Sequence, residues 1–299
     1  EIRSNIFQQK LSIPQYLGTA GSVIYGNFAK VRNHGVDLSI DYGKQISKDF
    51  TLQFKGTFTF ARNKVLEYDE APGLRPGMKT VGRRLNTFLG YVTNGLYENY
   101  TDVEESPTST LGNIAISPGD IKYVDQPDAN GNYDGRITSD DRVEIGDPWI
   151  PEIVYGFGPS MRWKNWDFSF FFQGQTNVSL IMENFEPFGE RSARGVLAWI
   201  ADDYWSPDHP NVNAKHPRLT RLTNNHNMQV STYWLRDASF LKLKNVELGY
   251  SYKKARFYIS GSNLLTISPF KHWDPEVGTG AGMQYPTQRI FNLGIQMSF

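Results

Sequence analysis

Runs of strictly alternating residues constrain the fold of this chain more than any other feature. Residues 36–43 read Val-Asp-Leu-Ser-Ile-Asp-Tyr-Gly, and the last run alternates in the same way up to the final residue. Successive side chains of a strand point to opposite faces, so each run has one apolar and one polar face. Several runs are longer than a usual soluble strand and approach the length that a tilted strand needs to cross a bilayer.

The connections between these runs fall into two classes. Residues 44–49, 164–165 and 253–254 are short turns, whereas about 13–33, 63–150, 178–235 and 268–286 are long and rich in Gly, Pro, Asn and Asp. This division is typical of an outer-membrane β-barrel with its short turns in the periplasm. It predicts eight strands, at about 1–12, 34–43, 50–62, 151–163, 166–177, 236–252, 255–267 and 287–299. Residues 86–98 then stay in an outer loop or cross as a pair.

Composition narrows the function classes. The 31 Lys and Arg residues balance 31 Asp and Glu residues, so no basic field favours nucleic acid. The chain has no cysteine, which excludes disulfide scaffolds and thiol catalysis. No apolar run approaches the 18 residues of a membrane helix, so only strands could cross a bilayer. The start, Glu-Ile-Arg-Ser-Asn, lacks an export signal, and we expect that signal to have been removed or to belong to a longer parent chain.

A soluble β-sandwich or propeller also alternates and is the alternative fold, with a soluble glycan-binding module as the alternative function. A membrane barrel exposes an apolar band and requires detergent, whereas a secreted module stays in buffer. Partition between detergent and buffer therefore discriminates between the two.

Stretches spread over nearly the whole chain resemble one family in the family's order. They are Asn27–Val36, Phe58–Tyr68, Gly90–Tyr97, Gly119–Tyr123, Pro151–Phe157, Phe171–Gly174, Trp234–Phe240, Leu243–Tyr250, Ser260–Leu265, Trp273–Val277 and Tyr285–Pro286. In these stretches the chain resembles the C-terminal part of a SusC/RagA-type TonB-dependent outer-membrane transporter of the Bacteroidetes. The resemblance implies an all-β fold: the C-terminal portion of a 22-stranded antiparallel transmembrane barrel with long extracellular loops at 63–150 and 178–235. Plug domain and TonB box would lie outside residues 1–299.

The same resemblance implies a function and partners. Such transporters import nutrients, oligosaccharides or peptides, across the bacterial outer membrane and are not enzymes. A SusD-like surface lipoprotein would cap the long-loop face, and TonB would drive uptake through the N-terminal part of the transporter. Leu293, Ile295, Met297 and Phe299 resemble the C-terminal signal of the barrel-assembly machinery.

Residues 128–142 resemble a calcium-loop-like segment of this family. Gly135 fits the bending glycine at the sixth position of a loop that offers oxygen ligands to Ca²⁺. The predicted ligands are Asn130, Asn132, Asp134, Arg136 through its carbonyl, Thr138 and Asp141. The first ligand is Asn rather than Asp, and the loop closes with Asp rather than Glu. A polar loop without an ion is the alternative.

Other candidate sites rest on side-chain chemistry. Loop aromatics could stack on sugar rings or contact a partner, or else pack inside a folded loop; they are Trp199, Tyr204, Trp205 and Trp273. Polar residues of the strands could line the solute route or form a hydrated barrel wall; they are Asp37, Asp41, Gln53, Lys55, Gln173 and Glu247. The five histidines are scattered, and no hydrolase motif or P-loop accompanies them.

Overall fold

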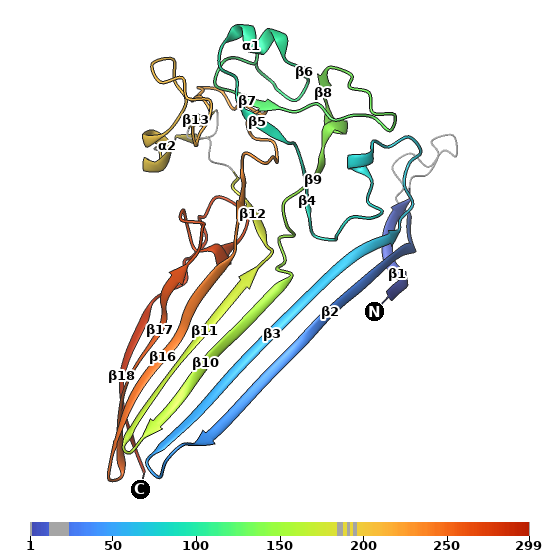
Figure 1. The fold of residues 1–299 in the computed structure, drawn as a ribbon. Coiled ribbons are helices and arrows are strands. Elements are labelled where there is room, and N and C mark those ends of the chain that lie inside the picture. Colours follow the sequence, from blue (N-terminus) through green and yellow to red (C-terminus); the bar gives the residue numbers. More distant parts are fainter. Residues whose placement is uncertain (1, 12–23, 184–187, 190–191, 194–195, 299) are drawn as a thin grey trace.

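One eight-stranded antiparallel sheet dominates the fold (Figure 1). The computed structural model describes residues 2–11, 24–183, 188–189, 192–193 and 196–298. The strand order in the sheet is β1-β2-β3-β10-β11-β16-β17-β18. The bounds are β1 Ile2–Leu11, β2 Ile24–Gln45, β3 Phe50–Glu67, β10 Ile153–Trp163, β11 Trp166–Thr176, β16 Phe240–Tyr252, β17 Ala255–Ile267 and β18 Ile290–Met297.

The eight predicted strands and the three predicted hairpins are confirmed. Each sheet neighbour pairs antiparallel, and the hairpin registers bring Gln45 opposite Thr51, Trp163 opposite Trp166 and Tyr252 opposite Ala255. Some predicted bounds were wrong. β2 begins at residue 24 rather than 34, and β3 runs to residue 67, since their outer ends continue to pair beyond the alternating core.

The two faces of the sheet differ in the way that the alternation predicts. One cross-strand row joins Phe168, Leu248, Ile259 and Leu293 across β11, β16, β17 and β18. The adjacent row, one residue along, joins polar residues around Glu247 on the opposite face. Although apolar, Ile259 and Leu293 are 52% and 85% exposed. A continuous exposed apolar face therefore covers one side of the sheet.

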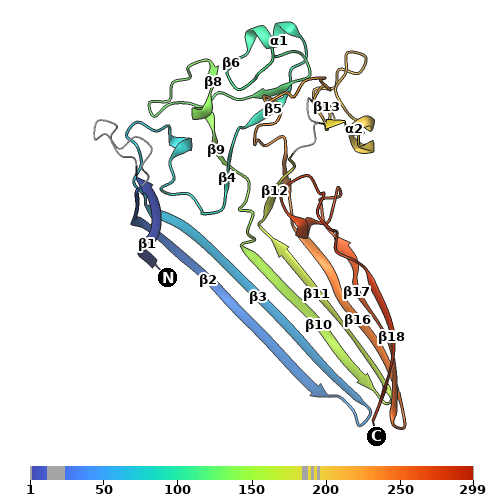
Figure 2. The same ribbon diagram turned by 180° about the vertical axis from the view of Figure 1, so that it is seen from behind.

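The described parts of the connections after β3 and after β11 fold over one end of the sheet, and the short turns lie at the other end together with the C-terminus (Figures 1 and 2). We call residues 68–152 and 177–239 the long-loop region. Its helices are α1 Tyr100–Glu105 and α2 Ala198–Asp202, with 3₁₀ turns at Pro76–Met78 and Ser139–Asp141. Its strands are β4 Phe88–Gly90, β5 Thr93–Leu96, β6 Thr108–Ser109, β7 Ile121–Tyr123, β8 Arg136–Ile137, β9 Val143–Ile145, β12 Ser179–Ile181, β13 Phe188–Gly189, β14 Ser192–Ala193 and β15 Leu235–Asp237.

Small two-stranded sheets organise the long-loop region: β4 pairs with β9, β5 with β7, β6 with β8, and β12 with β15. Residues 86–98 thus stay outside the main sheet. The predicted strand at 236–252 was too long, because residues 235–237 pair with β12 and β16 begins at residue 240. Leu96, Ile121, Ile137 and Leu180 are buried in one hydrophobic cluster. None of the helices described is long and apolar enough to cross a bilayer.

Candidate functional site

Asp120 is the centre of a buried polar network in the long-loop region. The side chain is fully buried, and its carboxylate accepts hydrogen bonds from Arg218 Nε at 2.7 Å and Nη2 at 3.0 Å. The side-chain amides of Asn224 and Asn227 each donate to Asp120 Oδ1 at 2.9 Å. A buried charge needs such complete pairing. The network fixes residues 218–227 against β7.

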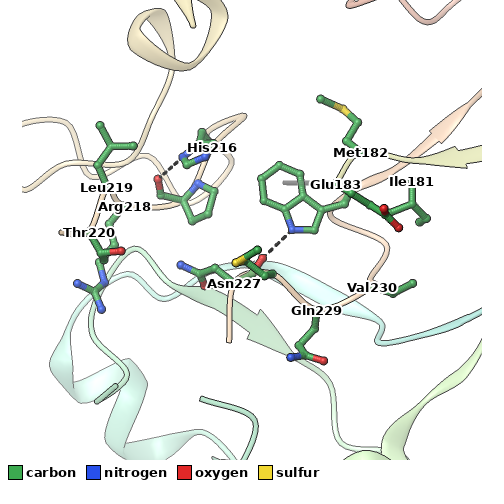
Figure 3. A pocket seen from close by; sticks show the side chains of 13 residues that line it. Ile181, Met182, Glu183, His216, Arg218, Leu219, Thr220, Asn227, Gln229 and Val230 are labelled. Atoms are coloured by element: carbon green, nitrogen blue, oxygen red, sulfur yellow. Dashed lines mark hydrogen bonds between the residues drawn. The ribbon is translucent and has the colours of Figure 1, made fainter. Parts of the chain in front are cut away.

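A pocket of about 140 Å³ lies next to this network (Figure 3). Its apolar walls come from Ile181 and Met182 at the end of β12, from Leu219 of the segment that Asp120 holds, and from Met228 and Val230 directly after it. Glu183, Arg218 and Gln229 add polar groups. A cavity of about 150 Å³ can hold a single aromatic ring. The pocket therefore has room for one ring or one apolar side chain of a larger ligand.

Hydrogen bonds hold the walls of this pocket in place. Trp234 Nε1 donates to the carbonyl of Asn227 at 2.7 Å, and His216 Nδ1 lies 2.8 Å from the carbonyl of Pro217 (Figure 3). Because Asn227 also donates to Asp120, pocket wall and buried network form one unit. Because these walls are already held in place, a ligand would not have to order them, which lowers the entropic cost of binding.

A second, more open hollow of about 560 Å³ shares Arg218 and Leu219 with the pocket. Its lining includes Tyr100, Tyr204 and Trp205. Trp205 is 7% exposed, and its indole nitrogen has no hydrogen-bond partner among the described residues. Aromatic rings with polar edges are suited to contact sugars or peptide groups.

The structure gathers the predicted loop aromatics but buries most of their surface. Trp199 packs against His272 with ring centroids 4.7 Å apart, and Trp273 packs against Phe270 at 4.5 Å. Trp205 covers Gly119, where φ is +86° and a Cβ atom would stand 2.3 Å from the indole ring. All four aromatics pack in or against the hydrophobic cluster, and Tyr204 and Trp205 also line the open hollow.

Arg75 occupies the centre of the predicted calcium loop. Its guanidinium contacts Asp134 at 2.5 Å and Asp141 at 2.7 Å, and lies 3.8 Å from Asp125. Burial raises the pKa of Asp125, and the nearby charges of Asp141 and Asp134 add to this. Thr138 caps the 3₁₀ turn that Asp141 closes. Among the described residues, no three acidic or histidine side chains are grouped for a metal.

The predicted polar wall residues share the face opposite the apolar one. Asp41 lies opposite Lys55, and both line a hollow of about 520 Å³ together with Gln53. Near the short turns, Arg256 pairs with Glu247 at 2.5 Å and also with Asp167. Asp37 and Gln173 lie opposite Thr59 and Lys242 respectively. This face is a charged and hydrogen-bonded surface.

Two further groups of interacting side chains, around Lys242 and around His226, could not be identified from sequence motifs. Lys242 is fully buried on β16 and binds Asp274 at 2.6 Å and Glu276 at 2.5 Å, which holds the 3₁₀ turn Pro275–Val277 against the sheet. His226 Nε2 lies 2.7 Å from the carbonyl of Ile121, and Nδ1 lies 3.1 Å from Ser109 Oγ. Burial lowers the pKa of His226. His226 is buried and Ser109 is half-buried, and together they join β6 to β7, which is a structural role.

Two TonB-dependent receptors are similar in sequence to this chain over more than nine-tenths of its length. TonB-dependent receptor P3 of Formosa agariphila is 27% identical over 96% of this chain and 30% of its own length. SusC of Bacteroides thetaiotaomicron, also a TonB-dependent receptor, is 26% identical over 91% of the chain and 27% of its own length. The chain is therefore similar in sequence to TonB-dependent receptors. No family model matches it.

Solved structures show the same fold. The RagAB peptide importer in its open-open state superposes with a TM-score of 0.72 and 21% identity, over 100% of this chain and 32% of the other. A RagAB peptide transporter structure gives a TM-score of 0.69 at 24% identity. This chain spans about a third of the length of the TonB-dependent receptors that it matches.

Proposed function

We propose that this chain forms part of the wall and the outer loops of a bacterial outer-membrane importer that depends on TonB. The observation that carries the proposal is the exposed apolar face of the sheet, in a chain similar in sequence to TonB-dependent receptors. Exposed isoleucine and leucine on strand after strand are stable against lipid and not against water. The opposite face would line the lumen, within the 22-stranded barrel that the family resemblance predicts.

The imported solute is an oligosaccharide or a peptide. The narrow pocket next to Asp120 would take one ring or one apolar side chain, and the aromatic hollow beside it would contact the next part of the same molecule. The two share Arg218 and Leu219, so one extended ligand could occupy both. A SusD-like lipoprotein would cover the long-loop region, and TonB would act through a part of the receptor outside the matched third.

Membrane fractionation and energised uptake test this proposal together. The protein should sediment with outer membranes, require detergent and co-purify with a surface lipoprotein. Cells with the receptor should accumulate a labelled oligosaccharide or peptide only while TonB is functional. A water-soluble protein of 34.1 kDa that binds glycans by itself would instead support the soluble module.

The last strand also leads to a prediction about insertion of the protein into the outer membrane. Leu293, Ile295 and Met297 lie on the exposed apolar face of β18, whereas Phe299 lies outside the described residues. We expect deletion of Phe299 to lower insertion into the outer membrane, measured as the heat-modifiable fraction on gels. Unchanged insertion would contradict a signal role for this residue.

A further inference from the structure

The short-turn end of the sheet carries a group of lysines beside an apolar hollow. Turns 46–49, 164–165 and 253–254 contain the exposed lysines Lys48, Lys164, Lys253 and Lys254, and one acid, Asp49. Backbone hydrogen bonds join these turns side by side, from Lys164 N to Asp49 O and from Ser251 N to Asn165 O, both 2.8 Å. No salt bridge joins these four lysines to any described carboxylate. We call them the turn lysines.

The positive charge of these turns contrasts with part of the long-loop region. In the long-loop region, residues 68–152 contain fifteen Asp and Glu residues against seven Lys and Arg residues. The chain as a whole is neutral. The turn lysines therefore form a local cationic surface at one end of the sheet.

Turn geometry does not explain the lysines. Lys164 has φ +52° and Lys253 has φ +54°, both in the left-handed region. Two-residue hairpin turns of this kind favour Asn, Asp and Gly, because side chains with a bulky Cβ are strained there. Two of the three turns thus hold a lysine at a position where the backbone favours another residue. This points to a requirement for the ammonium groups.

The apolar face meets the turns in an aromatic shelf. A hollow of about 400 Å³ is lined by Phe50, Met161, Trp163, Trp166 and Phe168 of three neighbouring strands. Trp163 and Trp166 are 58% and 46% exposed. The ammonium of Lys164 lies 5.8 Å from the Trp163 ring, and that of Lys253 lies 5.4 Å from the Tyr252 ring. The hollow has an apolar lining, which suits an acyl chain, and the ammonium groups of the adjoining turns are of the charge that suits a phosphate.

We propose that this end of the sheet binds an anionic phospholipid of the periplasmic leaflet, with the turn lysines on the phosphate headgroup and the aromatic shelf on an acyl chain. Tryptophan and tyrosine are favoured at the bilayer interface, and lysines near an anionic surface attract its lipids. This inference rests on the proposed function, because it requires the apolar face to lie in a membrane. It adds a lipid preference that a barrel wall does not need in order to fold.

The test compares lipids that differ only in headgroup. The intact receptor in detergent is titrated with phosphatidylglycerol and with phosphatidylcholine of the same acyl chains, and bound lipid is counted by native mass spectrometry. Phosphatidylglycerol should bind more tightly, and the difference should shrink as salt rises. Equal binding of the two lipids would overturn the proposal.

The variant Lys164→Asn/Lys253→Asn separates lipid binding from folding, since Asn suits both turn positions. A lysine near an anionic surface is worth about fivefold in binding, so the loss of two should weaken phosphatidylglycerol binding about 25-fold at low salt. Phosphatidylcholine binding and thermal stability should not fall. Lys79→Asn/Lys271→Asn makes the same charge change in exposed loop positions and should have no effect.

Each outcome points to one conclusion. An unchanged lipid preference in the turn variant, or an equal loss in the control variant, would overturn the phospholipid site. A receptor that sits in the outer membrane without such a preference retains the proposed function and loses only this inference. A protein that does not partition into membranes at all removes both.

Discussion

The sheet and the long-loop region place similar residues in opposite surroundings. On the sheet, Ile259 and Leu293 are 52% and 85% exposed, whereas Ile121 and Ile137 of the long-loop region are fully buried. Proteins in water bury most such side chains. One chain thus contains a sheet with an exposed apolar face and a loop region with a buried core, which is the division that the proposed outer-membrane importer needs.

Polar residues show the reverse arrangement. The sheet spreads its polar side chains along one face, while the long-loop region concentrates them in buried networks around Asp120 and Asp141. Loss of a single member should therefore damage the long-loop region more than loss of a polar residue damages the sheet. The following predictions test or sharpen this contrast.

The largest effect is expected for Asp120→Ala. Removing the carboxylate leaves Arg218 and two asparagine amides without their acceptor, which should destabilise the long-loop region by about 3–5 kcal/mol. Hydrogen exchange of the purified receptor measures this, with sheet amides as the internal reference. Asp208→Ala, at an exposed position, should change the free energy of unfolding by less than about 0.5 kcal/mol. If the amides of the sheet lost as much protection from exchange as those of the long-loop region, the contrast between the two regions would be wrong.

A smaller effect is expected on the sheet for Ile259→Arg. An arginine on the lipid face costs about 2–4 kcal/mol at the bilayer centre and less toward the interface, so at Ile259, in the cross-strand row of Phe168, we expect about 1–2 kcal/mol. Ser260→Arg is the matched control, since Ser260 lies opposite Glu247 on the polar face. Urea unfolding in lipid vesicles, followed by the gel shift of the folded barrel, compares the two. If Ser260→Arg proved the more damaging, the assignment of the two faces would be wrong.

Acid should weaken the long-loop region through His226. Burial lowers the pKa of this histidine from its ordinary 6.5, so the unfolded state takes up a proton more readily than the folded state. The stability contribution is complete above pH 6.5 and is lost as the pH falls below it. Proteolysis within the long-loop region should be faster at pH 5 than at pH 7.5. His226→Gln should flatten this dependence, and an unchanged pH profile would exclude His226 as its cause.

The smallest effect concerns calcium, whose binding at residues 128–142 stays a prediction. Arg75 already neutralises Asp134 and Asp141, so Ca²⁺ must displace its guanidinium. We expect Arg75→Gln to tighten Ca²⁺ binding by about fivefold, because a partly exposed ion pair is worth about 1 kcal/mol. Calorimetry of the receptor with and without the substitution measures this. If neither form binds Ca²⁺, Arg75 alone holds the loop.

Much of the sheet could be predicted because its determinants are local. Alternation in Val36–Tyr42 sets the faces of β2, and the short polar segment at Lys253–Lys254 sets the third hairpin. The outer ends were less predictable: β2 begins ten residues early because it pairs there with β1 rather than because its own residues alternate. Strand ends depend on neighbours.

The candidate site could be predicted only in part. All four predicted aromatics pack in or against the hydrophobic cluster, and nothing local distinguishes Tyr204 and Trp205, which also line a hollow, from Trp199 and Trp273. Asp120 carries no motif. Its partners Asn224 and Asn227 lie 104 and 107 residues away, so only the folded chain brings them together.

The sequence by itself determined the eight strands, their two faces, the short-turn end and the family resemblance, since period-two alternation and turn residues act over a few neighbouring positions. Tertiary structure decided the buried network at Asp120, the pocket beside it, the occupation of the calcium-loop-like segment by Arg75 and the alignment of the turn lysines. Each of these joins residues far apart in the chain, and their energies depend on burial and distance, which only the fold supplies.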